Sequence, residues 1–247
     1  MRVLRRIYYV LAGHLSWLLF GGVSLVLNFA CAVLLLLPGR ERRGAAVRKT
    51  ICRLFAAWCA WLHASRQIYV TWRGFTPEAM AGPAVYIANH PSLLDATFIL
   101  ARLPDAICIF KPAVMNNPAL GPAAILAGYA SGNAGVDLIR DVAARVAAGR
   151  SLLVFPEGTR SLDHVTLRPL RPGFALIAAR AKVPVRLLLV RAPKDLVPKG
   201  NPWWRIPQFP SHVEITLFAE LQPGPAEKAA DVTVRATELL STALAAT

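Results

Sequence analysis

The chain has 247 residues, of which 55% are hydrophobic and 17% charged, and its formal net charge is +14 at pH 7. Soluble domains carry about a quarter of charged residues, so this composition indicates a protein in contact with a membrane. The length accommodates one α/β domain with an N-terminal extension. The positive excess fits an anionic partner, namely phospholipid headgroups, nucleic acid or a phosphorylated substrate.

Two kinds of protein are disfavoured by where particular residues lie. The cysteines form no Cys-x-x-Cys pair and do not cluster with histidines, so neither a zinc site nor a disulfide framework is indicated; they are Cys31, Cys52, Cys59 and Cys108. The basic residues concentrate beside an N-terminal apolar segment, and no RNA- or DNA-binding motif accompanies them. We therefore expect no nucleic-acid partner.

The first element in the chain is an apolar run at residues 7–37 without a formally charged side chain. A membrane-spanning helix needs about 20 such residues, so the run predicts one long helix that crosses the bilayer at a tilt. A break at Gly21-Gly22, with a segment that re-enters the same side, is the alternative. A cleaved signal peptide is a further interpretation, but the run is too long for one and lacks a small-x-small cleavage site.

Positive charges flank this run unequally. Arg2, Arg5 and Arg6 precede it, whereas a denser group follows it beside a single acidic residue, Glu41; the group is Arg40, Arg42, Arg43, Arg48, Lys49 and Arg53. The more positive flank of a spanning helix stays in the cytoplasm. The pattern predicts a protein of the inner cell membrane whose remaining chain faces the cytoplasm.

The next segment, residues 44–66, has apolar side chains at helical spacing; they are Leu54, Phe55, Trp58, Trp61 and Leu62. Its basic residues gather at its start. After a spanning segment, this pattern favours an interfacial helix with aromatic anchors, and the alternative is a plain core helix. We assign residues 1–66 to N-terminal membrane-anchoring helices.

From residue 67 onward, strand and helix patterns alternate. Apolar runs predict strands at 67–72, 84–88, 106–110, 151–155, 183–190 and 212–219, and periodicity predicts helices near 92–101, 118–128, 136–148, 172–182 and 225–246. This order indicates an α/β fold with a mixed, partly parallel sheet flanked by helices. We expect this domain to cover 67–247. Because ligands bind such sheets at the carboxyl ends of strands, the loops after 84–88 and 151–155 are the expected site.

The first of these loops reads NHPSLLD. Ser92 and Asp95 match an acidic capping box, with Ser92 as N-cap of the next helix. A histidine can take a proton from an alcohol at neutral pH, and a carboxylate on its other ring nitrogen fixes the tautomer. Both roles of Asp95 are compatible, since a carboxylate has several acceptor positions. No Gly-x-Ser-x-Gly motif occurs, so His90 would activate a hydroxyl of the substrate itself.

The second loop reads FPEGTRS. Pro156 and Gly158 predict a turn. The Arg160 guanidinium and the Thr159 hydroxyl can hold an anion, because arginine suits phosphate. A charged surface turn with a local pair between Glu157 and Arg160 is the alternative interpretation.

Together, the two loops resemble the lysophospholipid/glycerolipid acyltransferase family, which includes the 1-acylglycerol-3-phosphate acyltransferases. The family pattern is His-x4-Asp, followed further along the chain by Phe-Pro-Glu-Gly-Thr-Arg-Ser. The downstream Val183-Pro184-Val185 is similar to a third family element, and the stretch FKPAVMNNPALGPAA, with Lys111, Pro118 and Gly121, resembles the family's lysine-containing approach to a turn. The resemblance covers residues 67–220.

The resemblance implies an α/β domain with membrane-embedded N-terminal helices and a membrane-bound O-acyltransferase. Such an enzyme would transfer a fatty acyl group from acyl-CoA or acyl carrier protein to a lysophospholipid hydroxyl, as in 1-acyl-glycerol-3-phosphate. His90 would be the general base, and Asp95 would orient it. The acceptor site would include Lys111, Glu157, Gly158, Thr159 and Arg160, with Arg160 on the phosphate. Because the thioester is already activated, no cofactor or metal is expected.

One stretch departs from the family pattern. Family members carry a Gly-x-Ile-x-Ile-Asp-Arg element between the two loops, whose arginine is assigned to the acceptor phosphate, whereas this chain reads GYASGNAGVDLIR at 128–140. The first arginine there is Arg140, which belongs to the next predicted helix. The alternative acceptor is therefore another lipid hydroxyl, such as an aminoacyl lipid, a lipid A-like sugar or a specialised lipid of a biosynthetic cluster.

A last feature is the segment NPWWRIPQF at 201–209, which contains Arg205 and lies close to Lys194 and Lys199. Tryptophans beside cations suit contact with a membrane at the level of the headgroups. Ordinary packing of a proline-rich loop is the alternative.

Overall fold

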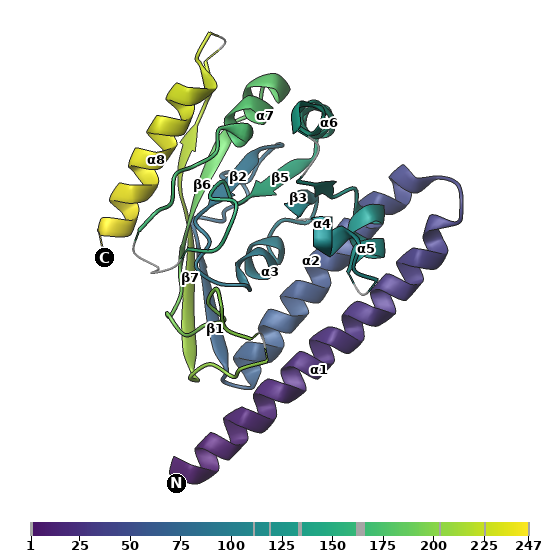
Figure 1. The fold of residues 1–247 in the computed structure, drawn as a ribbon, viewed down its shortest axis with the longest axis vertical. Coiled ribbons are helices and arrows are strands. Elements are labelled where there is room, and N and C mark those ends of the chain that lie inside the picture. Colours follow the sequence, from purple (N-terminus) through teal and green to yellow (C-terminus); the bar gives the residue numbers. More distant parts are fainter. Residues whose placement is uncertain are drawn as a thin grey trace.

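One sheet forms the centre of the protein, and helices cover both of its faces (Figure 1). The computed structural model describes residues 2–110, 112–118, 120–132, 135–161, 166–202, 204–224 and 226–246. The strand order is β1-β7-β6-β2-β5-β3-β4. The strands are β1 (Ile68–Arg73), β2 (Val85–Ala88), β3 (Ala106–Phe110), β4 (Ala130–Ser131), β5 (Ser151–Val154), β6 (Val185–Arg191) and β7 (Ser211–Leu221).

Neighbouring strands run parallel except for β6 and β7, which are antiparallel. The helices are α1 (Arg2–Leu35), α2 (Arg40–Ala64), α3 (Asp95–Leu100), α4 (Pro112–Met115), α5 (Gly121–Ala127), α6 (Gly135–Ala147), α7 (Gly173–Ala181) and α8 (Ala229–Ala245). The crossover from β2 to β3 runs one way along the sheet, and that from β5 to β6 runs back. Right-handed crossovers therefore place α3 and α7 on opposite faces, with α6 and α8 beside α7 (Figure 1). The predicted mixed α/β sheet is confirmed.

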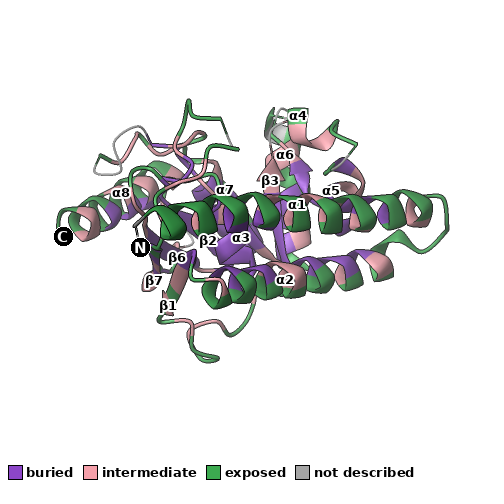
Figure 2. Cartoon of the chain, turned by 90° about the horizontal axis from the view of Figure 1, so that it is seen from below, coloured by how far each residue is buried: buried purple, intermediate pink, exposed green. Residues whose placement is uncertain are grey.

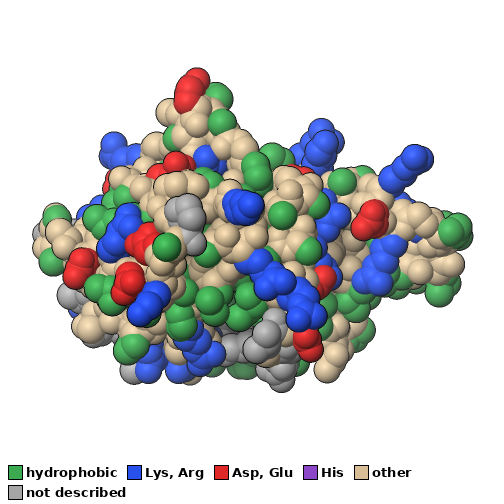
Figure 3. Space-filling view, turned by 90° about the horizontal axis from the view of Figure 1, so that it is seen from above, with side chains coloured by type: hydrophobic (Ala, Val, Ile, Leu, Met, Phe, Trp, Pro, Cys, Tyr) green, Lys and Arg blue, Asp and Glu red, His purple; other side chains and the backbone are tan. Residues whose placement is uncertain are grey.

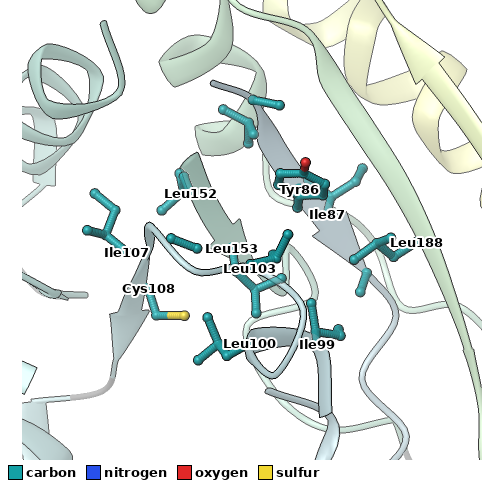
Figure 4. Packing of buried hydrophobic residues seen from close by; sticks show 14 of the residues in the cluster. Tyr86, Ile87, Ile99, Leu100, Leu103, Ile107, Cys108, Leu152, Leu153 and Leu188 are labelled. Atoms are coloured by element: carbon teal, nitrogen blue, oxygen red, sulfur yellow. The ribbon is translucent and has the colours of Figure 1, made fainter. Parts of the chain in front are cut away.

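The core lies around the three central strands, β2, β5 and β6. Every residue of β2 is buried, and β6 is buried up to its last residue. Strands covered on both faces need apolar side chains in both directions, which is why these segments read as continuous hydrophobic runs. Leu152 and Leu153 of β5, Ile107 of β3 and Ile99 of α3 all belong to this core (Figure 4).

The boundaries of the predicted strands and helices differ from the observed ones by a few residues, as expected of frayed ends. Two short elements, α4 and β4, were absent from the prediction. Each is too short to show a helical or strand period in the sequence. The downstream Val-Pro-Val string enters β6, and the Pro184 carbonyl accepts the amide of Val85 on β2 at 2.9 Å.

The N-terminal apolar run is one uninterrupted helix, α1, which continues through Gly21 and Gly22. The predicted single helix is confirmed, and no break occurs at the two glycines. By length and composition, the segment Val3–Leu35 is apolar enough to cross a membrane, and only 11% of its apolar window is buried. Figure 2 shows α1 exposed along most of its length.

The face of α1 that does touch the protein carries two of its polar side chains, Ser16 and Asn28. Ser16 is buried and accepts a hydrogen bond from the Gln67 amide at 2.8 Å and one from Trp61 Nε1 at 2.8 Å. Further along the helix, Asn28 accepts the backbone amide of Ala123 in α5 at 2.9 Å. Because polar groups in apolar surroundings need partners, these contacts define which face of α1 docks. The helix lies along the domain instead of projecting away from it (Figure 1).

The predicted interfacial helix corresponds to α2, and part of its apolar stripe lies inside the protein. Trp58 is buried, its ring is 4.8 Å from that of Phe20 in α1, and it stacks on Phe98 of α3 at 6.2 Å. Leu62 is also buried, whereas Trp61 is only partly covered. Part of the stripe thus packs between α1 and the domain, as the core-helix alternative expects, while Trp61 is exposed. Contact of α2 with a membrane interface stays a prediction. A spacing pattern cannot tell a protein surface from a membrane surface, since both are apolar.

Candidate active site

His90 stands at the carboxyl end of β2, in the central part of the sheet. Its Nδ1 lies 2.9 Å from Asp95 Oδ2, and its ring stacks on Phe155 at 4.1 Å between centroids. The His90 side chain retains 18% of its exposure, while Asp95 is fully buried. Among the described residues, none bonds to the other ring nitrogen, Nε2. The imidazole is thus held by a carboxylate on one side and can meet a substrate on the other.

The turn between His90 and α3 is built by short hydrogen bonds. Asp95 Oδ2 accepts the Ser92 amide at 2.7 Å, and Ser92 Oγ accepts the Leu94 amide at 3.1 Å. Helix α3 is assigned from Asp95 onward, yet these two hydrogen bonds are the reciprocal pair that the predicted capping box of Ser92 and Asp95 requires. The two predicted roles of Asp95 do coincide, because one carboxylate oxygen serves both the backbone and the histidine.

Asn89 is a residue that the sequence analysis missed. It is buried, its Nδ2 donates to the Val190 carbonyl at 2.8 Å, and its Oδ1 accepts the Val190 amide at 2.7 Å. The side-chain amide therefore continues the pairing with β6 at the point where the backbone of β2 ends. This allows the chain to turn away and present His90. An Asn directly before the histidine was the available signal.

Glu157 connects the two loops from within the protein. Its Oε1 accepts the backbone amide of His90 at 2.9 Å, and its Oε2 accepts the Ser161 hydroxyl at 3.0 Å and the Arg168 amide at 3.2 Å. The Ser161 amide in turn donates to the His90 carbonyl at 2.8 Å. Glu157 is only 5% exposed. It fixes the backbone around His90, and the surface pair with Arg160, which was the alternative interpretation, does not form.

The remainder of the second loop faces outward. Gly158 is exposed and has φ +70°, a conformation that favours glycine, and a Cβ there would lie 3.0 Å from the guanidinium carbon of Arg171. Thr159 is half-buried. Arg160 Nη1 donates to the carbonyls of Val197 and Pro198, each at 3.0 Å. The predicted turn is therefore present. The second loop, which bonds to the His90 backbone through Ser161, carries Arg160 and lies beside Arg171.

Two other predicted positions lie apart from this pocket or outside the described chain. Lys111 falls between described residues, and its predicted place in the acceptor site stays a prediction. Arg140 is exposed on α6, as its periodicity predicted. The stretch before it forms β4, which pairs with β3 at the edge of the sheet. No arginine occurs in that part of the stretch, so Arg160 is the motif arginine that lies beside the His90 loop.

The cysteines do not contribute a nucleophile. Burial raises the pKa of Cys59 to about 12 and raises the pKa of Cys108 further. Burial also raises the pKa of the half-buried Cys52. Thiols with a raised pKa are protonated at neutral pH and react poorly. The group that can act chemically in this part of the molecule is therefore His90.

Comparison with known proteins agrees with this geometry. The model of the Acyltransferase family matches residues 67–186, which include both loops. The chain is 35% identical to a 1-acyl-sn-glycerol-3-phosphate acyltransferase of Cocos nucifera over 109 residues. This aligned segment is 41% of this chain and 35% of that protein. The chain is 32% identical over 124 residues to 1-acyl-sn-glycerol-3-phosphate acyltransferase BAT2 of Brassica napus. That aligned segment is 48% of this chain and 36% of that protein. The match thus spans about a third of these relatives.

A solved structure has the same fold over the whole chain. The crystal structure of the 1-acyl-sn-glycerophosphate (LPA) acyltransferase PlsC of Thermotoga maritima superimposes with a TM-score of 0.72 and 22% identity, and it covers 99% of this chain and 97% of that one. This likeness includes the N-terminal helices, which lie outside the matched segment 67–186. The segment 67–186, which holds both motifs, thus matches the acyltransferase family, and the whole chain shares the fold of this solved structure.

Proposed function

We propose that the protein is a membrane-bound O-acyltransferase that acylates the hydroxyl of a lysophospholipid, with 1-acyl-glycerol-3-phosphate as the acceptor. The donor is a thioester, acyl-CoA or acyl carrier protein. The observation that carries the proposal is the His90–Asp95 pair at 2.9 Å, held at the carboxyl end of β2 beside the arginine of the second loop. The relatives named above act, by their names, on this acceptor class.

The reaction needs a base, an acid and little else. His90 Nε2 takes the proton of the acceptor hydroxyl as its oxygen attacks the thioester carbonyl carbon. The C–S bond then breaks, and the imidazolium returns the proton to the leaving thiolate. Buried Asp95 holds the ring through Nδ1 and stabilises the imidazolium between these steps. A positioned base of this kind is worth roughly 10²–10⁴-fold in rate.

The acceptor phosphate is the group we assign to Arg160. Arginine binds phosphate through two parallel N–H donors, which gives direction as well as affinity. Arg160 comes from the loop whose Glu157 and Ser161 bond to the His90 backbone. An acceptor held by its phosphate on Arg160 would therefore have a fixed distance to the histidine.

The membrane part of the proposal rests on α1. Its outward face exposes large apolar side chains over the whole length of the helix, including Leu4, Leu11, Leu18, Val26 and Phe29. Its opposite face is docked on the domain, so we infer that α1 lies against the bilayer with its exposed face in the lipid, with residues 67–247 as the catalytic unit. Cationic side chains, with hydrophobic ones between them, are spread over the face of the molecule that is seen from above in Figure 3. Because the cytoplasmic leaflet carries anionic headgroups, which attract basic segments, we infer from the positive flank after α1 that the catalytic unit lies on the cytoplasmic side of the inner membrane.

A different lipid acceptor is the second candidate. The family arginine between the two loops has no counterpart in the described part of 128–140, where Arg140 lies exposed on α6. An acceptor without a phosphate, such as an aminoacyl lipid or a lipid A-like sugar, would leave Arg160 without its proposed ligand. The two candidates share the chemistry of His90 and differ in what the arginine binds.

The test is acyl transfer by the purified protein in vesicles of neutral lipid. Radiolabelled acyl-CoA, and separately acyl carrier protein, are supplied with 1-acyl-glycerol-3-phosphate or with 1-acylglycerol, which lacks the phosphate. We expect transfer to the phosphorylated acceptor and a loss of at least about a hundredfold in His90→Ala. In Arg160→Lys, we expect the acceptor KM to rise about tenfold because an ammonium does not reproduce the paired donors.

Each outcome of this assay decides one part of the proposal. Equal transfer to both acceptors, with an unchanged KM in Arg160→Lys, would remove the phosphate from the proposal and favour the second candidate. Undiminished activity of His90→Ala would remove the general base. The control substitution is Arg180→Lys on α7. It also replaces a guanidinium by an ammonium, but at an exposed position outside the two loops.

A further inference from the structure

The connection between β6 and β7 touches both the active site and α1. It comprises residues 192–210 and contains no helix or strand in its described part. Irregular connections of this length are uncommon in small domains and usually have a function. Leu196 and Val197 are buried within it, whereas Lys194, Lys199 and Trp204 are exposed. The connection is therefore partly embedded in the protein, and its buried part is the part that meets the catalytic loops.

At its active-site end, this connection holds Arg160 by one nitrogen. Both hydrogens of Arg160 Nη1 are used, one on the Val197 carbonyl and one on the Pro198 carbonyl, each at 3.0 Å. Among the described residues, neither Nε nor Nη2 has a hydrogen-bond partner. These two nitrogens form the edge of a guanidinium that binds carboxylate or phosphate side-on. The contacts thus fix the arginine while leaving its anion-binding edge open.

The carbonyl that holds Arg160 is itself held tightly. The Val197 carbonyl also accepts the amide of Leu93, in the His90 loop, at 3.3 Å. Val197 has φ +45° and is 3% exposed. A β-branched residue in this conformation is an outlier that costs about 1–3 kcal/mol, and it persists only where the surroundings impose it. The Val197 carbonyl is therefore placed by the structure around it, at a point where it contacts both catalytic loops.

At its other end, the connection packs on α1. The Ile206 side chain lies so close to Gly13 that a Cβ at position 13 would be 2.8 Å from Ile206 Cδ1. The Phe209 ring is 5.7 Å from the Tyr9 ring. The two limbs of the connection are tied to each other, because the amide of Gln208 donates to the Asp195 carboxylate at 2.7 Å. A continuous series of contacts thus leads from Gly13 to Arg160.

We propose that α1 is part of the acceptor site: through Gly13 and Ile206 it fixes the 192–210 connection, which positions the open edge of Arg160 for the anionic group of the acceptor. The inference rests on the acyl-transfer function proposed above and adds positioning residues to it. Gly13 and Ile206 touch no substrate, and they act through the connection. The helix that meets the membrane would thus also set the geometry at which a membrane-borne acceptor is bound.

Paired substitutions of glycines in α1 test this. Gly13→Val places branched atoms against Ile206, whereas a Cβ at Gly21, in the same helix, would meet nothing within 4 Å. Acyl transfer is measured in vesicles at varied concentrations of 1-acyl-glycerol-3-phosphate. We expect Gly13→Val to raise the acceptor KM about tenfold with little change in kcat, which corresponds to weakening one charge-assisted hydrogen bond. Gly21→Val should keep the wild-type values. Ile206→Ala, which removes the contact without a clash, should act in the same direction as Gly13→Val.

A double-mutant cycle separates positioning from general damage. If Gly13→Val acts through Arg160, it should raise KM little further when Arg160 is already Ala, because interacting sites are not additive. Equal effects of Gly13→Val in both backgrounds, or equal effects of Gly13→Val and Gly21→Val, would overturn the inference. Absence of acyl transfer by the wild-type protein would instead refute the proposed function, so the two failures are distinguishable.

Discussion

The His90 loop and helix α1 both hold polar side chains against the domain, but they leave very different surfaces behind. In the loop, Asp95 and Glu157 are buried and their oxygens bond to the backbone around the histidine. In α1, Ser16 and Asn28 bond to the domain while the opposite face exposes apolar side chains. The comparison shows that hydrogen bonds fix position in both regions, whereas the exposed groups differ: a histidine ring in the loop and apolar side chains on α1. We propose a reacting hydroxyl as the partner of the first and lipid as the partner of the second.

The largest effect is expected where the loop exposes its reactive atom. His90→Ala should lower kcat by roughly 10²–10⁴-fold, while the melting temperature changes little, because the backbone amide bonded to Glu157 remains. The measurements are initial rates of acyl transfer and thermal unfolding. His212→Ala, at an exposed histidine of β7, is the matched control. If both variants retained activity, the loop would not be the catalytic region, and its contrast with α1 would not be one between a reactive surface and a lipid-contacting surface.

The exposed face of α1 can be tested by adding a charge to it. Phe29 is 75% exposed, and an aspartate there would have to enter the lipid in our proposal. We expect Phe29→Asp to weaken partition into phospholipid vesicles by about a hundredfold, as measured by sedimentation. Leu176→Asp introduces the same charge at an exposed position of α7 and should leave partition unchanged. Equal loss in both variants would mean that α1 is not the membrane-contacting surface.

An intermediate effect is expected for the carboxylate that joins the two loops. In Glu157→Gln, one oxygen is replaced by an NH2 group that faces hydrogen-bond donors. We expect the free energy of unfolding to fall by about 2 kcal/mol, since buried hydrogen bonds to charged groups are worth roughly this amount. Urea denaturation measures it, with Glu238→Gln on exposed α8 as control.

The same Glu157 variant distinguishes two roles of this residue: holding the His90 backbone in place, or binding the acceptor directly. The displaced His90 should lower kcat, and the acceptor KM should change less than it does in Arg160→Lys. A rise in KM with unchanged stability would show instead that Glu157 contacts the acceptor, as the sequence motif suggested.

The smallest effect is expected on the docked face of α1. Asn28→Ala removes the acceptor of the Ala123 amide, which lies in the first turn of α5. We expect a loss of about 1 kcal/mol in the free energy of unfolding, with vesicle partition as in the wild-type protein. The opposite result, normal stability with weakened partition, would reverse the assignment of the two faces.

The sequence predicted the elements of this fold well because their signals are local. The strand runs at 84–88 and 151–155 are apolar in both directions, and they became β2 and β5 at the centre of the sheet. The His90–Asp95 pair was predictable because a single turn joins the two residues. The environment of α2 could not be predicted in the same way, since Trp58 and its neighbours have the same spacing whether they face lipid or protein.

The amino-acid sequence by itself determined that two motif loops follow two central strands, that a long apolar helix precedes them, and that a histidine and an aspartate are paired. Only the tertiary structure decided that Glu157 holds the His90 amide, that Val197 holds Arg160, and that Gly13 meets Ile206. Local patterns arise from side-chain periodicity and turn chemistry, which few neighbouring residues set. The other contacts join residues far apart in the chain, often through backbone atoms that every residue possesses. The identity of the residues therefore does not predict them.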